Sequence, residues 1–344
     1  MKVYEIDPTT DARWEHLLQS HLRASIFHTR GWLEALRRTY GYTPIAFTTS
    51  QPGSALSNGI PFCKVSGLFG KERLVSLPFS DHCEPLVERK SQLSCLLAYL
   101  QQKQEAEGWD YVELRPKTSA FAVVDGFGQS QSFLFHQLDL RFNLDEIFQN
   151  THKDCIQRKI RRAEREGLVC KQGTSDSLLR CFYQLLIETR RRHGVPTQPI
   201  AWFRNLIACM GNNLMISVAS KNGSPIASIL TLKFKRELTY KYGCSDHRFH
   251  KLGAMQLLLW RAIRGAKDDQ LWALDLGRSD SDNPGLIAFK NRWGVAPVRL
   301  SYWRLSESAS REGTKLSRLG RQLFAHAPLP VVSAAGKILY RYMG

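Results

Sequence analysis

Apolar residues recur with two different spacings along the chain, and the change of spacing marks the expected helices and strands. Four leucines between positions 93 and 100 repeat with helical spacing and predict a helix over about 91–107. The alternating, turn-rich stretch 60–79 predicts antiparallel strands before this helix, and the stretch 109–115 predicts a strand after it. The first half of the chain is therefore expected to fold into strands, a helix and a further strand.

The second half of the chain repeats this order of elements. Its apolar pattern predicts three strands, a helix and a final strand, over about 214–220, 225–234, 237–243, 252–267 and 272–276. In both halves the tripeptide Ser-Asp-His, at 80–82 and at 245–247, stands between the antiparallel strands and the helix. Repetition of this kind indicates an α/β (α+β) fold with two copies of one unit, each a mixed, largely antiparallel sheet with a helix packed on it.

A cationic helix is expected between the two halves. Residues 152–166 are rich in helix formers, and Arg158, Arg161, Arg162 and Arg165 recur with a spacing that places them on one helix face. Few acidic residues stand where they would neutralise this stripe. One interpretation is a surface that faces phosphate, and an ordinary solvated helix face is the other.

Residues 306–344 are expected to form a basic C-terminal helical tail. Arg311, Lys315, Arg318 and Arg321 mark one face of its first helix, and leucines mark the other. Basic amphipathic helices bind anionic membrane surfaces, so we expect peripheral contact with the inner face of a membrane. A tail docked on the protein core is the alternative.

Composition and charge narrow the class of protein. The 344 residues are 43% hydrophobic and 10% aromatic, which suffices for two packed cores and excludes a disordered chain. The formal net charge of +17 favours a polyanionic partner, whether nucleic acid, an anionic membrane or a phosphate-bearing substrate. The eight cysteines lack metal-binding spacing, so we expect no metal site. The sequence shows neither a signal peptide nor a membrane-spanning run, which predicts a cytoplasmic location.

The candidate functional site lies where the last expected strand ends. The segment 275–294 brings fixed charge, glycine and aromatic residues together directly after an apolar run. Open α/β sheets bind ligands at the carboxyl ends of their strands, which favours a site here over a charged surface loop. Residues 283–285, Asn-Pro-Gly, predict a turn within the segment.

The segment 248–255 opens a helix and is a second candidate, because a helix N-terminus can receive a pyrophosphate; an ordinary first helical turn explains it equally well.

Five segments carry a family resemblance: FHTRGWLEALRRTYGY (27–42), LPFSDHCEPL (77–86), YVELR (111–115), HKDCIQRKIRRAEREG (152–167) and LDLGRSDSDNPGLIAFKNRWG (274–294). Together they resemble the FemAB-like branch of the GNAT acyltransferases. The resemblance implies two tandem GNAT-like domains, which we place at 1–145 and 146–305, followed by the tail. It also implies acyl transfer onto an amine, with an acyl-CoA or an aminoacyl-tRNA as the donor.

Two features of the sequence depart from that family. Residues 168–213 leave no room for the long helical arm that Fem ligases often carry. The GNAT pyrophosphate pattern is matched only by Gly253. The resemblance therefore indicates the fold and the reaction class better than it indicates the donor.

GNAT-type transfer requires a positioned amine, a proton acceptor and stabilisation of the oxyanion. We assign Asp275 as the catalytic residue, acting as a base or an orienting carboxylate. The residues expected to bind the substrate are Arg278, Asp280, Asn283, Lys290, Arg292, Trp293, Asp81 and His82. The residues expected to bind the donor cofactor are Arg248, Lys251 and Gly253. Trp293 has a core anchor as its alternative role, and Glu113 and Arg115 are expected to be structural or inter-domain.

The sequence thus predicts an acyltransferase that acts on an amine of a cell-envelope glycan or a lipid-linked precursor. The expected donor is an acyl-CoA, with acetyl-CoA as the first candidate, and the expected acceptor bears phosphate or glycan. An aminoacyl-tRNA-dependent peptidyltransferase of the Fem type is the alternative enzyme. An alternative of another class is a non-catalytic basic protein that docks on membrane or nucleic acid.

Overall fold

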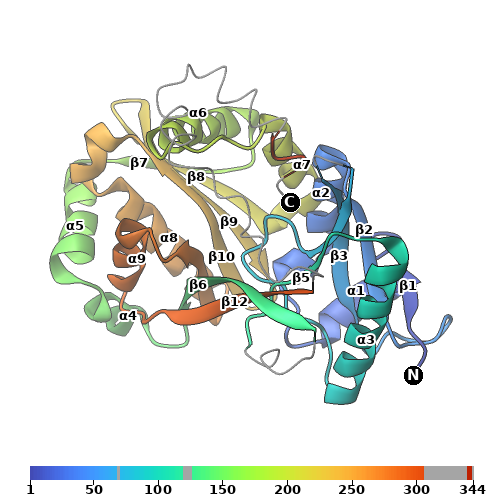
Figure 1. Cartoon of the computed structure of the whole chain (residues 1–344). Helices are drawn as coiled ribbons and strands as arrows, with labels where there is room; N and C mark the ends of the chain where they lie inside the picture. Colours follow the sequence, from blue (N-terminus) through green and yellow to red (C-terminus); the bar gives the residue numbers. More distant parts are fainter. Residues whose placement is uncertain (68–69, 119–125, 306–338, 343–344) are drawn as a thin grey trace. The chain divides into compact units, whose positions relative to one another are not determined.

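The chain divides into two compact units in the computed structural model, which describes residues 1–67, 70–118, 126–305 and 339–342. Unit 1 contains residues 1–133, 300–305 and 339–342 of the described part, and unit 2 contains residues 134–299. Each unit combines helices with a mixed sheet, so the predicted α/β class with tandem units is confirmed (Figure 1). Apart from residues 339–342, the tail predicted at 306–344 lies outside the described residues.

The sheet of unit 1 is built mainly from neighbouring antiparallel strands. In order they are β1 (Tyr4–Ile6), β2 (Thr43–Thr48), β3 (Ile60–Ser66) and β4 (Glu72–Ser76). The strand β5 (Val112–Leu114) then runs parallel to β4, because the helix α3 (Lys90–Glu107) carries the chain back between them. The late strand β12 (Val298–Leu305) pairs antiparallel with β5.

The core of unit 1 lies under α3. Leu96, Leu97 and Leu100 of this helix pack against apolar side chains of the strands, including Phe62 and Leu74. Two further helices, α1 (Ala12–Ser20) and α2 (Arg30–Tyr40), complete the unit.

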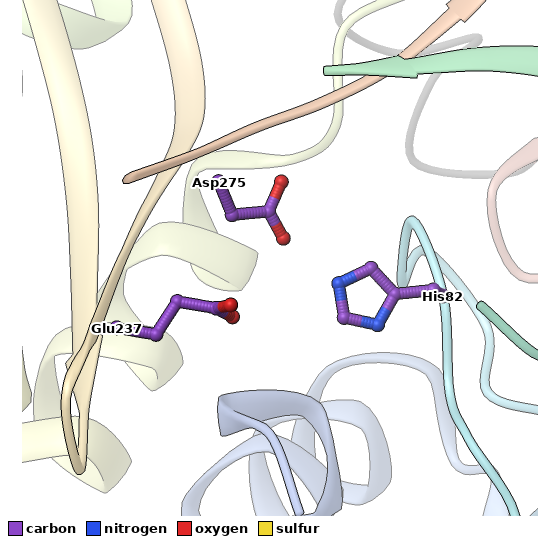
Figure 2. Close-up of side chains that lie close together, drawn as sticks. All are labelled: His82, Glu237 and Asp275. Carbon is purple, nitrogen blue, oxygen red and sulfur yellow. The ribbon is translucent and has the colours of Figure 1, made fainter. Parts of the chain in front are cut away.

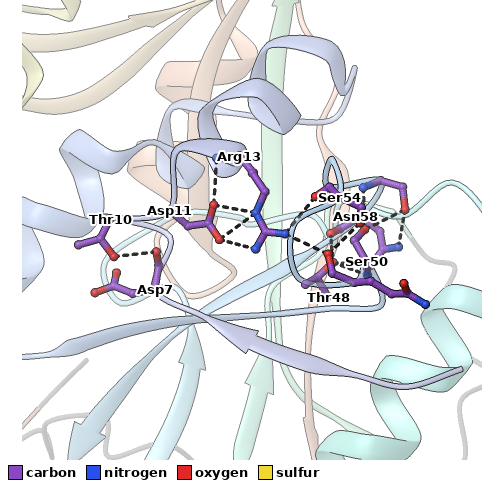
Figure 3. A network of polar contacts seen from close by, with 10 residues as sticks. Asp7, Thr10, Asp11, Arg13, Thr48, Ser50, Ser54 and Asn58 are labelled. Carbon is purple, nitrogen blue, oxygen red and sulfur yellow. Dashed lines mark hydrogen bonds and ion pairs between the residues drawn. The ribbon is translucent and has the colours of Figure 1, made fainter.

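A polar network fixes the start of α1 (Figure 3). Asp11 caps the helix and accepts hydrogen bonds from the guanidinium of Arg13. The same guanidinium donates to the carbonyl oxygens of Gln51 and Ser54, at 3.1 and 3.0 Å. This network ties the helix to the loop that follows β2.

The sheet of unit 2 has the same mixed character. Its strands are β6 (Phe127–Asp139, which begins in unit 1), β7 (Val169–Gly173), β8 (Leu214–Lys221), β9 (Ser224–Phe234), β10 (Glu237–Ser245) and β11 (Ala273–Asp280). The strands β7 to β10 are antiparallel neighbours in sequence order. The strand β11 runs parallel to β10, and the helix α8 (Ala254–Asp268) connects them.

Helices cover both faces of the unit 2 sheet. The other helices are α4 (Leu144–Asn150), α5 (Arg158–Arg165), α6 (Asp176–Arg192), α7 (Ile200–Met210) and α9 (Pro284–Asn291), with a π-helical turn η3 (Lys153–Gln157) and 3-10 turns η4 (Gly211–Asn213) and η5 (His247–Leu252). Helices α6 and α8 pack on opposite faces of β8 to β10, and α5 packs against α8 (Figure 1). Leu257, Leu258 and Ile263 of α8 are buried in the core of the unit.

Both units contain an antiparallel strand pair, a helix and a parallel strand in the same order, as the sequence repeat predicts. These are β3, β4, α3 and β5 in unit 1 and β9, β10, α8 and β11 in unit 2. The turn predicted at 283–285 is wrong, because Asn283 caps α9 and Pro284 is its first residue. Proline suits this position because its fixed φ fits the first helical turn, where an amide proton has no intrahelical partner. Among the described residues, no helix has both the length and the apolar character that crossing a membrane requires.

Candidate active site

The strand β11 brings a buried carboxylate to the predicted site. Leu274 and Leu276 belong to the core of unit 2, and the alternation of side chains along a strand turns Asp275 to the other face. Asp275 is fully buried, and its Oδ1 accepts a hydrogen bond of 2.6 Å from the backbone amide of Gly277. Gly277 itself has a φ of 72°, a conformation that glycine adopts without strain.

A second carboxylate lies beside Asp275. The parallel register places Thr239 of β10 opposite Asp275, so Glu237, two residues earlier, is on the same face of the sheet. Carboxylate oxygens of Glu237 and Asp275 lie within 4.8 Å of each other (Figure 2). The amide of Gln137 donates a hydrogen bond of 2.7 Å to Glu237. Two carboxylates this close together repel each other and therefore attract a cation such as an alkylammonium group.

Lys290 places a buried ammonium at the end of the same strand. It lies on α9, only 2% exposed, and its Nζ donates hydrogen bonds of 2.9 Å to the carbonyl oxygens of Gly277 and Arg278. The adjacent Asn291 contacts the ring of His136 through Oδ1 and Nε2, at 2.8 Å. Burial lowers the pKa of His136, the hydrogen bond to Asn291 opposes this, and the charge of Lys290 lowers the pKa further. The site thus combines carboxylates, an ammonium and a neutral imidazole.

The remaining candidates of this segment occupy different environments. Arg278 is partly exposed, and Asp280 and Arg292 are exposed. The side chain of Asn283 accepts a hydrogen bond from the amide of Leu286 and so caps α9. Trp293 is completely buried in the core of unit 2, which agrees with its alternative role as a core anchor. Stacking on a substrate would require an exposed ring.

Two predicted substrate-binding residues belong to unit 1. The ring of His82 is 1% exposed and packs edge-on against Phe27, with ring centroids 5.2 Å apart. The backbone carbonyl of Asp81 accepts a hydrogen bond of 2.8 Å from the hydroxyl of Tyr302.

The predicted donor-binding segment forms one wall of a cationic groove in unit 2. We call it the α5–η5 groove; it has a volume of about 370 Å³ and is lined by Asp154, Arg158, Lys159, Arg162, Arg165, His250 and Lys251. Gly253, with a φ of 77°, lies directly after η5 and packs against α5. A Cβ atom at this position would lie 2.3 Å from the carbonyl oxygen of Lys159. Arg248 is not among the lining residues, and its guanidinium donates hydrogen bonds to both carboxylate oxygens of Asp246.

Sequence reasoning missed Glu237 and the groove as a whole. An isolated glutamate at the start of a strand carries no local signal, and only the register of β10 on β11 brings it to Asp275. The arginine stripe and the 248–255 segment were both candidates for phosphate binding. Their meeting depends on the packing of η5 against α5, which the glycine at position 253 permits.

Comparison with known proteins shows what part of this chain is similar to. Residues 151–291 match the family described as Acetyltransferase (GNAT) domain. A relative by sequence is the UDP-N-acetylmuramoylpentapeptide-lysine N(6)-alanyltransferase of Weissella viridescens, 29% identical over 138 residues. The match covers 39% of this chain and 40% of that protein, so the chain spans about two-fifths of the length of this relative.

Solved structures show the same fold over most of the chain. FemX is similar with a TM-score of 0.70 and 13% identity, over 89% of this chain and 97% of that one. A tandem GNAT protein from the clavulanic acid biosynthesis pathway has a TM-score of 0.56 and 11% identity, over 90% and 99%. L-PGS from Bacillus licheniformis has a TM-score of 0.54 and 15% identity, over 90% and 94%. At such identities these likenesses concern the fold alone.

The family match and the transferase relative indicate that the chain is an enzyme, and residues 151–291 are similar to an acyltransferase domain of the GNAT type. More narrowly, its resemblance to the FemAB-like branch of that superfamily is confirmed.

Proposed function

We propose that this enzyme transfers an acyl group to a primary amine of a cell-envelope glycan or a lipid-linked precursor. The observation that carries the proposal is the pair of carboxylates in unit 2, Asp275 and Glu237, within 4.8 Å of each other. An amine acceptor arrives at neutral pH mainly as an ammonium ion, which two carboxylates attract and orient. The sequence relative is named for transfer to a lysine N6 amine, which supports an amine acceptor of the envelope.

The chemical steps follow from the residues in this site. Asp275 takes a proton from the acceptor ammonium, and the neutral amine then attacks the acyl carbonyl directly. The hydrogen bond from Gly277 holds the carboxylate of Asp275 in a fixed orientation for this transfer. Lys290 supplies positive charge close to the strand end, where the oxyanion of the tetrahedral intermediate requires stabilisation. Collapse of the intermediate breaks the bond to the donor's sulfur or oxygen, and the departing thiolate or alkoxide takes the proton that the attacking nitrogen loses.

Two donors are compatible with this chemistry. An acyl-CoA is the donor expected of a GNAT domain, and the domain matches over residues 151–291. An aminoacyl-tRNA is the second candidate, favoured by the sequence relative, which is named as an alanyltransferase. Both carry phosphates, and both are consistent with the net charge of +17.

The predicted substrate-binding role of Arg278, Asp280 and Arg292 is part of this proposal. These side chains are at least partly exposed and follow Asp275 along the chain, where they can contact an anionic acceptor.

For the tail, we retain weak peripheral binding to anionic membrane, because its basic residues would bring the enzyme to a lipid-linked acceptor. Vesicle co-sedimentation at low and high salt, with and without residues 306–344, measures this binding.

The experiment that tests the function is transfer followed by mass spectrometry. Purified protein is incubated with lipid-linked and nucleotide-linked envelope precursors, together with acetyl-CoA or a mixture of aminoacyl-tRNAs. We expect a mass increase of one acyl group on an amine of the acceptor. A reaction abolished by ribonuclease assigns the tRNA donor, and one that persists assigns the acyl-CoA. Absence of product with every donor and acceptor would contradict the proposal.

A further inference from the structure

Unit 2 exposes two aromatic side chains, whereas the chain buries its other rings. Among the described residues, Phe142 and Trp272 are the only Phe, Tyr or Trp side chains that are exposed, at 54% and 53%. The other seven tryptophans of the chain are buried or half-buried. Single exposed rings are common on protein surfaces, whereas adjacent ones mark a surface that binds a partner.

Backbone hydrogen bonds hold the two rings at the same end of the sheet. The amide of Leu140, two residues before Phe142, donates a hydrogen bond of 2.8 Å to the carbonyl oxygen of Trp272. The amide of Trp272 in turn donates one of 2.7 Å to the carbonyl oxygen of Arg236. The connections that follow β6, join α8 to β11 and join β9 to β10 are therefore neighbours.

Cations accompany the exposed rings. The guanidinium of Arg236 lies over the ring of Trp272, 4.3 Å from its centroid, and has no ion-pair partner within the described parts of the chain. Lys235, beside it in the turn between β9 and β10, is also exposed. Arg141 precedes Phe142 and is exposed as well. We use the name Trp272 patch for Arg141, Phe142, Lys235, Arg236 and Trp272.

The three connections that form this patch carry a modest excess of positive charge. Residues 139–143, 233–236 and 267–272 contain five Lys or Arg and three Asp. Two of the acids are already paired, Asp139 with Arg141 at 2.5 Å and Asp269 with Lys233 at 2.9 Å. The net charge of +17 on the whole chain adds a longer-range attraction to any anionic surface.

We propose that the Trp272 patch docks unit 2 on the surface of an anionic lipid bilayer. Aromatic rings favour the boundary between lipid headgroups and acyl chains, which suits Phe142 and Trp272. Lys and Arg beside such rings keep their charged ends at the headgroups, which suits Lys235 and Arg236. This surface is separate from the tail at 306–344.

Docking through this patch holds the carboxylate pair of unit 2 close to the bilayer. Glu237 follows Arg236 directly, and Asp275 is three residues after Trp272. At about 3.3 Å per residue, the strand places Asp275 about 10 Å from the patch. A lipid-linked acceptor then presents its amine to the site without leaving the membrane. This consequence rests on the proposed function, whereas the binding itself does not.

The first test measures the apolar part of the binding with the full chain. The patch variant carries Phe142→Ala and Trp272→Ala, and the control variant carries Leu22→Ala and Val169→Ala, two apolar side chains that are 97% and 58% exposed elsewhere. Co-sedimentation with vesicles of phosphatidylglycerol and phosphatidylcholine measures partitioning. We expect the patch variant to partition about tenfold or more weakly than the control, because binding scales with the apolar area that enters the interface. Circular dichroism and thermal melting verify the fold of each variant.

The second test measures the electrostatic part. The variant Lys235→Gln with Arg236→Gln is compared with Lys171→Gln with Arg261→Gln, two exposed cations of β7 and α8, so both proteins lose the same charge. We expect partitioning at low salt to fall about fivefold for each cation lost from the patch. The difference between the two variants decreases at high salt, which screens the attraction. It is absent with vesicles of phosphatidylcholine alone.

Tryptophan fluorescence separates the patch from the tail. Vesicles with brominated acyl chains quench a tryptophan that enters the interface. We expect Trp272→Phe to retain vesicle binding, since an aromatic ring remains, but to lose most of the quenching seen in the wild type. Residues 306–344 contain no tryptophan, so binding through the tail alone would leave the quenching of the two proteins equal.

The proposal is overturned if the patch variant and its apolar control partition equally, or if Trp272→Phe is quenched as strongly as the wild type. A wild-type protein that does not bind anionic vesicles at low salt also overturns it. A dimer that the patch variant abolishes, in a protein without vesicle binding, would instead assign the patch to a second copy of the chain. Transfer activity with any of these results leaves the proposed function standing. Conversely, vesicle binding through the patch in a protein without transfer activity contradicts only the proposed function.

Discussion

Glu113 of unit 1 and Asp275 of unit 2 occupy matching places in the repeated fold, but their surroundings are opposite. Each is an acid in the strand that follows the crossover helix and runs parallel to its neighbour. Glu113 pairs with two guanidinium groups, those of Arg115 at 2.8 Å and Arg304 at 2.7 Å. Asp275 instead accepts a hydrogen bond from a backbone amide, and a carboxylate oxygen of Glu237 lies within 4.8 Å of it.

Strand register explains how the two environments arise. The antiparallel register of β12 places Arg304 opposite Glu113, whereas the parallel register of β10 places Glu237 on the same face as Asp275. In unit 1 burial alone would raise the pKa of Glu113, but Arg115 and Arg304 outweigh burial and hold it below its ordinary value. The same strand position therefore holds a carboxylate paired with guanidinium groups in unit 1. In unit 2 we propose that the carboxylate at this position attracts and deprotonates an ammonium ion.

The largest effect is expected for Asp275→Asn. The amide oxygen of Asn can still accept the hydrogen bond from Gly277, so the fold is preserved while the proton acceptor is lost. We expect the transfer rate to fall about 10²–10⁴-fold, as for removal of a positioned base. Steady-state kinetics with the identified acceptor measures this effect, and Asp269→Asn, an exposed acid of the same unit, is the control. Wild-type turnover in Asp275→Asn would assign Asp275 a structural role like that of Glu113.

The second effect is expected for Glu113→Gln, on stability. The change leaves the charges of Arg115 and Arg304 buried without their carboxylate, and breaking a buried ion pair costs about 3–5 kcal/mol. Denaturant unfolding of the full chain measures this loss, with Glu107→Gln on the surface of α3 as the matched control. A loss no larger than that of the control would contradict a stabilising role for the ion pairs of Glu113.

The third effect concerns the pH dependence of stability that we expect from His28, a buried histidine of unit 1. Burial is the main cause that lowers the pKa of His28 to about 4, although its hydrogen bond to the carbonyl of Glu84 opposes this. The unfolded chain binds a proton near pH 6.5, so the unfolded state takes up protons first as the pH falls. The contribution of His28 to the free energy of unfolding is therefore fully present above pH 6.5. The free energy of unfolding decreases by about 3 kcal/mol between pH 6.5 and 4.

The variant His28→Gln tests this pH dependence. It is less stable at pH 7, because the bonds of the ring to Ser25 and to the carbonyl of Glu84 are altered. Its stability changes less than that of the wild type between pH 6.5 and 4, since the titrating ring is absent. Melting temperatures of both proteins across this range measure the difference, and parallel pH curves would show that another group is responsible. The pKa of Glu113 is lowered by Arg115 and Arg304 against the effect of burial, so the stability from these ion pairs is present at neutral pH and is lost as the pH falls below the ordinary value of 4.5.

Apolar spacing predicted the elements of both crossovers, because the spacing is a local property of the sequence. The helix expected over 91–107 is α3, and the strand expected over 237–243 is β10. The neighbours of Asp275 depend on long-range pairing and were not predictable in this way. Glu237 reaches Asp275 through strand register. Lys290 is buried on α9, which begins at Pro284, within the segment where the sequence indicated a turn.

The smallest effect concerns the start of the two crossover helices. In unit 1 the residue before α3 is Arg89, with an extended φ of −112°, whereas in unit 2 the residue before α8 is Gly253, with a φ of 77°. We expect Gly253→Ala to destabilise the protein by about 1–2 kcal/mol, the cost of a left-handed conformation for an L-residue. Displacement of the carbonyl oxygen of Lys159, 2.3 Å from the new Cβ, adds to this cost. The matched control is Gly265→Ala on α8, where a Cβ meets nothing within 4 Å; we expect it to stabilise the helix by about 0.5–1 kcal/mol. Thermal unfolding of both variants measures these changes in stability, which we expect to have opposite signs. If Gly253→Ala also stabilises the protein, then η5 does not depend on glycine to pack against α5, and the two crossover helices begin in equivalent ways.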